Sequence, residues 1–254
     1  MSLRKENGIV IASKTVGEAD SILTILAESG LKSKFKLRGI KKSKSRPIIA
    51  SEIGSLINID FYLHERDEIS NIKEVSILER FEKVKSNYVG YLLLSYFCEL
   101  LDTLLPESNE NQSSYELLLK AITTLNTEII FFHFLPFFKI RLLFLLGLLS
   151  KENTCNTCGV EFSQVESASI QNHNLEFVCS DCKPSYKSQL NLIYLIQYLF
   201  KTRYINLEIP KINFAEIIEL DRILNDFLRS YINRELKTLE ILYKQIGGKL
   251  ELLT

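Results

Sequence analysis

The sequence predicts an α+β protein, with an N-terminal five-stranded β-barrel followed by an α-helical domain that carries a four-cysteine zinc module. Short runs rich in β-branched residues precede residue 80, helical periodicity dominates after it, and two C-x2-C pairs interrupt the helical part. We therefore expect a barrel domain at 1–80, a helical domain at 81–254, and a zinc-ribbon-like insertion at about 151–186.

Five runs near the amino terminus have the length and composition of strands, and turn residues such as Gly17 and Gly30 separate them. The runs span residues 8–12, 21–26, 31–38, 55–62 and 68–75. A five-stranded barrel in about eighty residues is most simply an OB-fold, a fold that frequently binds oligonucleotides.

Composition is that of an ordinary globular protein: 254 residues, of which 46% are hydrophobic and 24% charged. The formal net charge is zero, which argues against a uniformly basic nucleic-acid binder but permits a local basic surface. Ser13, Lys14 and Glu18 interrupt the apolar residues near the amino terminus. We therefore expect no signal peptide, a cytoplasmic location, and cysteines in a reducing compartment.

The helical pattern begins after Ile77. Residues 88–105 carry a broad apolar stripe that stops at Pro106, and a capping box, with Ser113 as cap and Glu116 three residues later, predicts the start of the next helix. Further helices are expected over residues 189–204, 214–232 and 235–246.

Residues 129–149 are long and apolar enough to span a bilayer, but His133, Pro136, Lys139 and Arg141 lie within them. Charged side chains are unfavourable in lipid. We therefore expect no membrane segment here, but a buried helix or a helix pair broken at Pro136.

Four of the five cysteines have the spacing of a metal site. Cys155 and Cys158 form one C-x2-C pair, Cys179 and Cys182 form the other, and twenty residues lie between the pairs. Each pair supplies two tetrahedral ligands from one tight turn. The spacing predicts one structural zinc ion with its coordination complete, and a disulfide or redox-active pair is the alternative.

The segment between the cysteine pairs is expected to form a hairpin, with strands at 165–170 and 175–178 and His173 at its tip. His173 could replace one thiol as a ligand, although its position favours the turn. Gly159 permits the positive φ that lets backbone amides approach the thiolates. The fifth cysteine, Cys98, is expected to be a small core residue.

One segment, residues 32–46, concentrates positive charge without any acidic residue. Its eight cations are Lys32, Lys34, Lys36, Arg38, Lys41, Lys42, Lys44 and Arg46. Side chains alternate along a strand, so Phe35 and Leu37 should face the barrel core while the first four cations form an exposed row. The other four cations would lie in a loop.

Two interpretations of this cationic segment are open. Lysines commonly solvate a surface or guard a sheet edge. Eight adjacent cations repel one another unless an anion is present, and a nucleic-acid backbone supplies one, so we favour DNA binding. Phe61, Tyr62 and His64 could stack on bases, although strand aromatics more often fill a barrel.

Motifs of the common enzyme classes are absent from the sequence. It contains no Walker loop, no H-E-x-x-H, no G-x-S-x-G and no H-x-E deaminase signature. We therefore expect a protein that is not an enzyme.

Several motifs occur in the order found in one known family. Residues 8–11 (GIVI), 17–20 (GEAD) and 38–46 (RGIKKSKSR) resemble the amino-terminal domain of RecO, the bacterial recombination mediator. Residues 138–147, which lead into Cys155, are similar to the central helix that precedes the zinc module of that family, and residues 231–238 resemble its closing helical motif.

The resemblance implies an OB-fold followed by a helical domain, and binding of single- and double-stranded DNA. It also implies annealing of complementary strands and, with RecR, replacement of single-stranded DNA-binding protein by RecA in the cytoplasm, at the nucleoid. Carried over to this chain, the DNA role falls on residues 32–46 and the metal role on the four paired cysteines. The alternative from the residues is a zinc-stabilised adaptor that binds an acidic protein.

Overall fold

The structure is a computed structural model of the whole chain. It describes residues 2–43, 47–63, 69–107, 111–128, 132–184, 188–232 and 236–247. The chain divides into two compact units, one made of residues 1–129 with 236–249 and the other of residues 130–235 with 250–254. The expected domain boundary near residue 80 falls at the end of the last barrel strand, and three helices after it and one near the carboxyl terminus belong to the same compact unit as the barrel.

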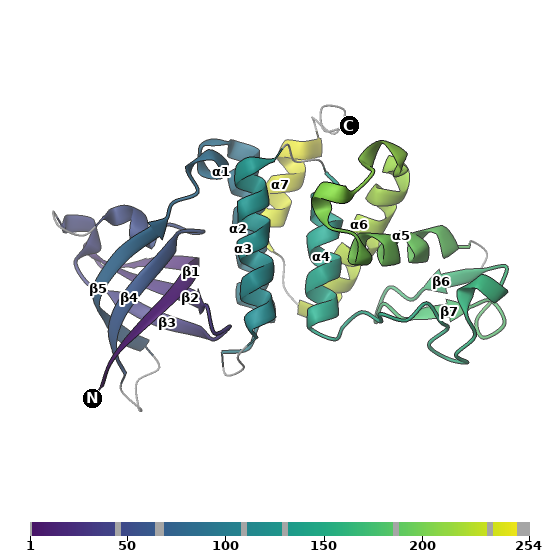
Figure 1. Cartoon of the computed structure of the whole chain (residues 1–254), viewed down its shortest axis with the longest axis horizontal. Coiled ribbons are helices and arrows are strands. Elements are labelled where there is room, and N and C mark those ends of the chain that lie inside the picture. The colour runs from purple at the N-terminus through teal and green to yellow at the C-terminus, as the bar shows by residue number, and fades with distance from the viewer. Residues whose placement is uncertain are drawn as a thin grey trace. The chain divides into compact units, whose positions relative to one another are not determined.

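The first unit contains a closed five-stranded barrel with the order β1-β2-β3-β5-β4, in which β3 and β5 pair in parallel (Figure 1). This confirms the predicted barrel. Its strands are β1 (Ser2–Val16), β2 (Asp20–Ala27), β3 (Lys32–Leu37), β4 (Leu56–Leu63) and β5 (Ile69–Glu79).

Side chains on alternate strand positions fill the barrel, as the period of two requires. The buried cluster comprises Val10, Leu23, Ile25, Phe35, Leu37, Ile40, Ala50, Ile57, Ile59, Phe61 and Ile72. Strand β1 begins at Ser2, several residues before the apolar run that starts at Gly8. Its polar first half pairs with β4, from Ser2 opposite Leu63 to Asn7 opposite Asn58, so backbone pairing extends the strand where side-chain hydrophobicity gives no signal.

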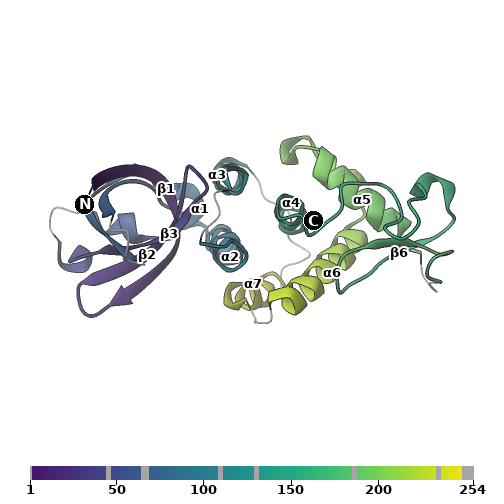
Figure 2. The same ribbon diagram turned by 90° about the horizontal axis from the view of Figure 1, so that it is seen from below.

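Among the described residues, the first unit also contains the α-helices α1 (Glu82–Ser86), α2 (Tyr88–Leu104), α3 (Gln112–Thr127) and α7 (Lys237–Gly247). Helix α2 ends before Pro106 as predicted, and it packs against β1, α1, α3 and α7. Figure 2 looks along α2 and α3 and shows α7 beside α2.

The predicted capping box of α3 is wrong, because Asn111 is the N-cap in place of Ser113. The Asn111 side chain accepts a hydrogen bond from the Ser114 N–H at 3.2 Å, and its own N–H donates to the carbonyl of Gly30 at 3.3 Å. Asn satisfies a first-turn amide as well as Ser does. The tertiary bond to Gly30 places the helix start two residues earlier than the local pattern indicates.

A carboxylate of α2 caps the amino-terminal end of α7 and so holds the two helices together. The N–H groups of Lys237 and Thr238 donate to Glu99 of α2 at 3.1 and 3.0 Å. An acidic side chain at this end satisfies amides that the helix leaves unpaired and complements the helix dipole. Leu242 of α7 is fully buried, which adds apolar contact to this polar cap.

The second unit contains α4 (Phe134–Leu145), α5 (Leu190–Lys201), α6 (Phe214–Ile232) and a hairpin of β6 (Ala168–Ile170) and β7 (Phe177–Cys179). Of the two expectations for the apolar segment, the buried helix is confirmed and the helix pair broken at Pro136 is wrong. Pro136 lies in the first turn of α4, where no intrahelical N–H bond is required, so the helix continues through it. No helix among the described residues is long and apolar enough to cross a membrane.

The charges inside this apolar helix have partners within the second unit. Lys139 is fully buried and its Nζ lies 2.7 Å from Asp221 Oδ1 and 2.6 Å from Asn225 Oδ1 on α6. Arg141 donates to the carbonyl of Thr202 at 2.6 Å. The two cations therefore fix α4 against its neighbours.

Candidate nucleic-acid interface and metal centre

Strand β3 presents the first part of the cationic segment, and its inward face is as predicted. Phe35 and Leu37 are buried in the barrel. The strand pairs along its length with β2 and over Lys34 to Lys36 with β5, so it is interior to the sheet and does not offer a free edge that lysines would need to guard.

The expectation of an exposed row beginning at Lys32 is wrong for that residue. Lys32 is 5% exposed, and its Nζ donates to the carbonyl of Asp102 at 2.7 Å and lies 3.8 Å from the Asp102 carboxylate. Asp102 lies in the last turn of α2, where carbonyls lack helical partners and the helix dipole favours a cation. Lys32 therefore has a structural position between the barrel and α2.

Other cations of the segment pair with acids that lie far away in the sequence. Lys34 bonds Glu107, whose carboxyl pKa is lowered by that hydrogen bond. Lys42 Nζ lies 2.6 Å from Glu18 on the exposed surface. The segment contains no acid of its own, yet the fold brings acids to it, which reduces its net positive field.

Asp20 shapes the turn that follows β3. Its carboxylate accepts from the Gly39 N–H at 2.8 Å and lies 3.0 Å from Lys36 Nζ. The Gly39 bond and then the Lys36 ammonium hold the pKa of this carboxyl below its usual range. Gly39 has φ +68°, a conformation that glycine adopts without strain.

The turn continues into a short 3-10 helix, η1 (Ile40–Lys42), whose Lys41 N–H donates to the carbonyl of Ala19 at 3.1 Å. Ile40 is buried in the barrel core, which anchors the turn. Arg38, Lys41 and Lys42 are exposed on it. Lys44 and Arg46 lie outside the described residues.

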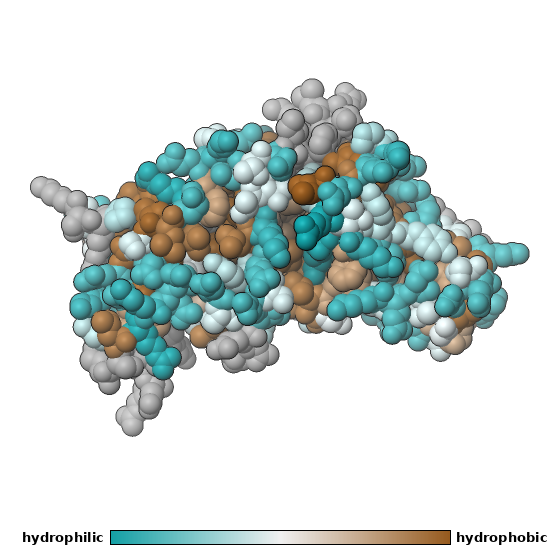
Figure 3. Space-filling view, in the orientation of Figure 1, coloured by the Kyte–Doolittle hydropathy of each residue, from teal (hydrophilic) through white to brown (hydrophobic). Residues whose placement is uncertain are grey.

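The candidate stacking aromatics do not form a platform in the described barrel. Phe61 is buried and packs edge-on against Phe35, with ring centroids 4.9 Å apart. Tyr62 is partly exposed on β4 and has Lys73 Nζ 6.0 Å from its ring centroid, and His64 lies outside the described residues. Figure 3 shows hydrophobic surface over β4 and β5 on an otherwise mostly hydrophilic face.

The four paired cysteines converge as predicted. The Sγ atoms of Cys155, Cys158, Cys179 and Cys182 all lie within 4.8 Å of one another. The Cys158 and Cys179 sulfurs are 3.7 Å apart. Four thiolates about 2.3 Å from a zinc ion form a tetrahedron with edges of roughly 3.8 Å, whereas a disulfide requires about 2.05 Å. The geometry fits a metal ion and excludes a disulfide between Cys158 and Cys179.

The hairpin and its turns prepare this site. Strand β7 ends on Cys179, whose N–H donates to Cys155 Sγ at 3.4 Å. Burial acts to raise the pKa of the Cys155 thiol, but N–H donors from Cys179, Cys158 and Thr157 outweigh it and lower the pKa to about 6. Gly159 has φ +76°, as expected, and bonds back to the Cys155 carbonyl at 2.8 Å. These backbone donors therefore favour the thiolate form of Cys155.

His173 and Cys98 lie where the sequence predicts. His173 lies exposed in the turn between β6 and β7 and is not part of the sulfur cluster. Cys98 is fully buried in α2, and burial raises the pKa of its thiol. Zinc bound by the four thiolates would have no open position for a water nucleophile, so the ion would stabilise the module.

Two models of known protein families together match almost the whole chain. The model of the recombination protein O N-terminal domain matches residues 1–81, and that of the C-terminal domain matches residues 85–240. A relative from Leptospira biflexa serovar Patoc, named DNA repair protein RecO, is 36% identical over 97% of this chain and 99% of its own length.

More distant relatives carry the same name. The protein from Desulforamulus reducens is 27% identical over 98% of each chain, and that from Bacillus pumilus is 25% identical over 97% of this chain and 98% of its own. The matched ranges include the barrel with the turn at residues 38–42, called the cationic turn below, and the helical part with the four paired cysteines. The chain belongs to the RecO family of DNA repair proteins.

Proposed function

We propose that this chain is a non-enzymatic recombination mediator that binds single- and double-stranded DNA and anneals complementary strands. With RecR it would help RecA to replace single-stranded DNA-binding protein on DNA, in the cytoplasm at the nucleoid. The observation that carries the proposal is the anchored turn that exposes Arg38, Lys41 and Lys42 beside the barrel.

The turn combines fixed position with exposed charge. Asp20 and Ala19 hold its backbone, and Ile40 anchors it in the core. Cations on such a turn meet a phosphate backbone without first ordering a loop, so little conformational entropy is lost on binding. Neutralising phosphates on two strands also reduces their mutual repulsion, which is the physical requirement of annealing.

Salt dependence tests the proposed DNA contact. If three to five phosphates are neutralised, the affinity should fall by ~40- to ~500-fold between about 50 and 200 mM salt. A variant with Lys41, Lys42, Lys44 and Arg46 changed to alanine should lose most of this slope and anneal complementary strands more slowly.

A control variant removes the same charge from exposed positions on helices and turns elsewhere. Its changes are Lys120→Ala, Lys201→Ala, Lys211→Ala and Arg229→Ala. It should keep the salt slope and the annealing rate of the wild type. Equal annealing rates for wild type and the first variant would refute the assignment, and weak, salt-insensitive DNA binding by the wild type would favour an adaptor for an acidic protein.

We further propose that the four-cysteine site holds one structural zinc ion. The converging sulfurs and the N–H donors to Cys155 support this. Elemental analysis of protein purified without chelators should find about one zinc per chain, and absence of zinc would contradict the proposal.

A further inference from the structure

A cavity of about 440 Å³ lies in the first unit between the barrel and its helices. The 3-10 helix η2 (Ile48–Ser51), the turn after β5, α1 and α2 contribute to its walls. Its lining includes Ile49, Glu52, Arg80, Glu82, Lys85 and Tyr91. Its volume lies within the range of small-molecule sites, about 300–1,000 Å³.

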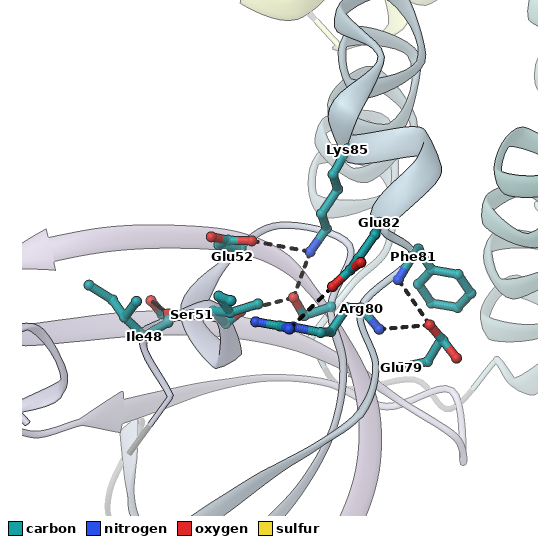
Figure 4. Close-up of polar contacts among 10 residues, drawn as sticks. Ile48, Ser51, Glu52, Glu79, Arg80, Phe81, Glu82 and Lys85 are labelled. Carbon is teal, nitrogen blue, oxygen red and sulfur yellow. Dashed lines mark hydrogen bonds and ion pairs between the residues drawn. The ribbon is translucent and has the colours of Figure 1, made fainter. Parts of the chain in front are cut away.

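The corner between β5 and α1 sets one side of the cavity. The Glu79 carboxylate accepts hydrogen bonds from the N–H groups of Arg80 and Phe81 at 3.0 and 3.1 Å. Phe81 has φ +53°, which is unusual for a residue other than glycine, and its buried ring fixes the corner. Arg80 is thereby placed with its guanidinium 3.2 Å from Glu82 Oε1 (Figure 4).

A second cation reaches the cavity from α1. Lys85 points toward the barrel, where its Nζ lies 3.5 Å from Glu52 Oε2 (Figure 4). The same Nζ bonds Ser55 Oγ at 2.7 Å. Its side chain is 13% exposed, whereas that of Glu52 is 48% exposed. The cavity therefore has a partly buried ammonium and an accessible carboxylate on this side.

The charges of the lining residues indicate which class of ligand the cavity fits. Two cations, Arg80 and Lys85, are matched by two carboxylates, Glu52 and Glu82, so a free phosphate would meet two negative charges. A nucleobase is neutral and offers donors and acceptors at its edge and apolar faces on either side. Carboxylates accept from amino groups of bases, a guanidinium donates to their carbonyl and ring-nitrogen acceptors, and a tyrosine ring can stack.

Residues that line the cavity follow the cationic segment closely along the chain. Helix η2 follows residues 32–46 after Pro47, and it packs against η1, which carries Lys41 and Lys42. Ile49 of η2 lines the cavity. A DNA strand whose phosphates lie on the cationic turn therefore has a base-sized cavity a few residues away.

We propose that this cavity is a base-binding subsite for single-stranded DNA. Tyr91 stacks on one unpaired base, and Glu52, Glu82 and Arg80 bond its edge. The subsite rests on the proposed DNA-binding function and adds to it a contact that is independent of phosphate charge. Bases with an amino group, namely guanine, adenine and cytosine, are favoured over thymine because only they donate amino hydrogens to the carboxylates.

The test uses the full chain and a single-stranded oligonucleotide of mixed sequence in which deoxycytidines are replaced by 5-iododeoxycytidine. Irradiation should attach the base to Tyr91, as located by peptide mass spectrometry. Tyr88, which is 58% exposed on the same helix but does not line the cavity, is the matched control and should not be labelled. Labelling of Tyr88 and Tyr91 alike, or of neither, would overturn the proposal.

Equilibrium binding gives a second readout. Tyr91→Leu removes the aromatic face but keeps apolar bulk, and it should raise the Kd for a mixed single strand about 5- to 150-fold, the equivalent of ~1–3 kcal/mol per stacked base. The slope of affinity against salt should stay unchanged, because no phosphate contact is lost. Tyr88→Leu should bind as the wild type does.

Failure of the subsite and failure of the proposed function give different results. If Tyr91→Leu and Arg80→Gln both bind like the wild type with a steep salt slope, the subsite is refuted and DNA binding by the cationic turn stands. If the wild type itself binds single strands without a salt slope, the proposed function fails. Arg80→Gln, at a side chain 44% exposed, keeps the test available should Tyr91→Leu fold poorly.

Discussion

Replacing Lys139 by methionine should strongly destabilise the second unit. The ammonium is fully buried, 2.7 Å from an Asp221 carboxylate whose side chain is 2% exposed, so the change leaves a carboxylate in the core without its cation. Removing one partner of a buried ion pair typically costs about 3–5 kcal/mol. Asn225, which donates to Asp221 at 3.2 Å, offsets only part of this loss.

The assay is amide hydrogen exchange of the full chain, followed by mass spectrometry of peptides from α4 and α6. Because the chain has two compact units, whole-chain unfolding need not be two-state, whereas exchange reports each unit separately. The double variant Lys139→Met/Asp221→Leu should recover most of the stability, because a buried ion pair replaced by apolar groups is often neutral.

The exposed pair of Arg229 with Asp226 on the same helix provides the control. Its atoms are 3.9 Å apart and the side chains are 66% and 48% exposed. Arg229→Met should change exchange by no more than the ~0.5 kcal/mol of an ordinary surface substitution. A loss below ~1 kcal/mol for Lys139→Met, or a double variant as unstable as the single one, would refute the account of α4 given above.

Three further outcomes are expected. Burial lowers the pKa of His133 below 6.5 in the folded protein, so on acidification the unfolded chain binds a proton at a higher pH than the folded one. The second unit should therefore lose stability as the pH falls below about 6.5. Amide hydrogen exchange at pH 7 and 5.5 should show this loss, and His133→Phe should abolish it. Chelation should increase exchange in residues 155–182 and leave the barrel unchanged, and an equal increase in both would argue against a local metal module. Asp20→Asn should weaken DNA binding about two- to tenfold by loosening the turn at Gly39, although it makes the surface more positive; tighter binding would show that charge outweighs positioning.

Local periodicity in the sequence predicts the barrel and most helices, because strand and helix patterns repeat over neighbouring residues. Alternation places Phe35 and Leu37 in the core as observed, and Phe214–Ile232 has the predicted bounds. The metal site is equally local, since each C-x2-C pair forms one turn. The start of α3 was predicted incorrectly because a tertiary bond to Gly30 contributes to it.

The charge balance of the cationic segment could not be predicted from neighbouring residues. Asp102 is 70 positions from Lys32, and Glu107 is 73 positions from Lys34. Both acids come close only after the chain following the barrel has formed α2. The cavity lined by Tyr91 has the same origin, because its residues come from η2, the turn after β5 and two helices and share no motif.

These pairings divide the cations of the segment into buried and exposed ones. Exchanging an exposed partner such as Glu18 for a phosphate has little energetic penalty, since a surface ion pair contributes about 0–1 kcal/mol. Lys32 cannot make that exchange without leaving a site where it is 5% exposed and bonded to α2. Under the proposed function, a protein of zero net charge contacts DNA through Lys42 and its exposed neighbours, while Lys32 joins the barrel to α2. The proposal therefore places DNA contact on the turn after β3 and not along the whole strand.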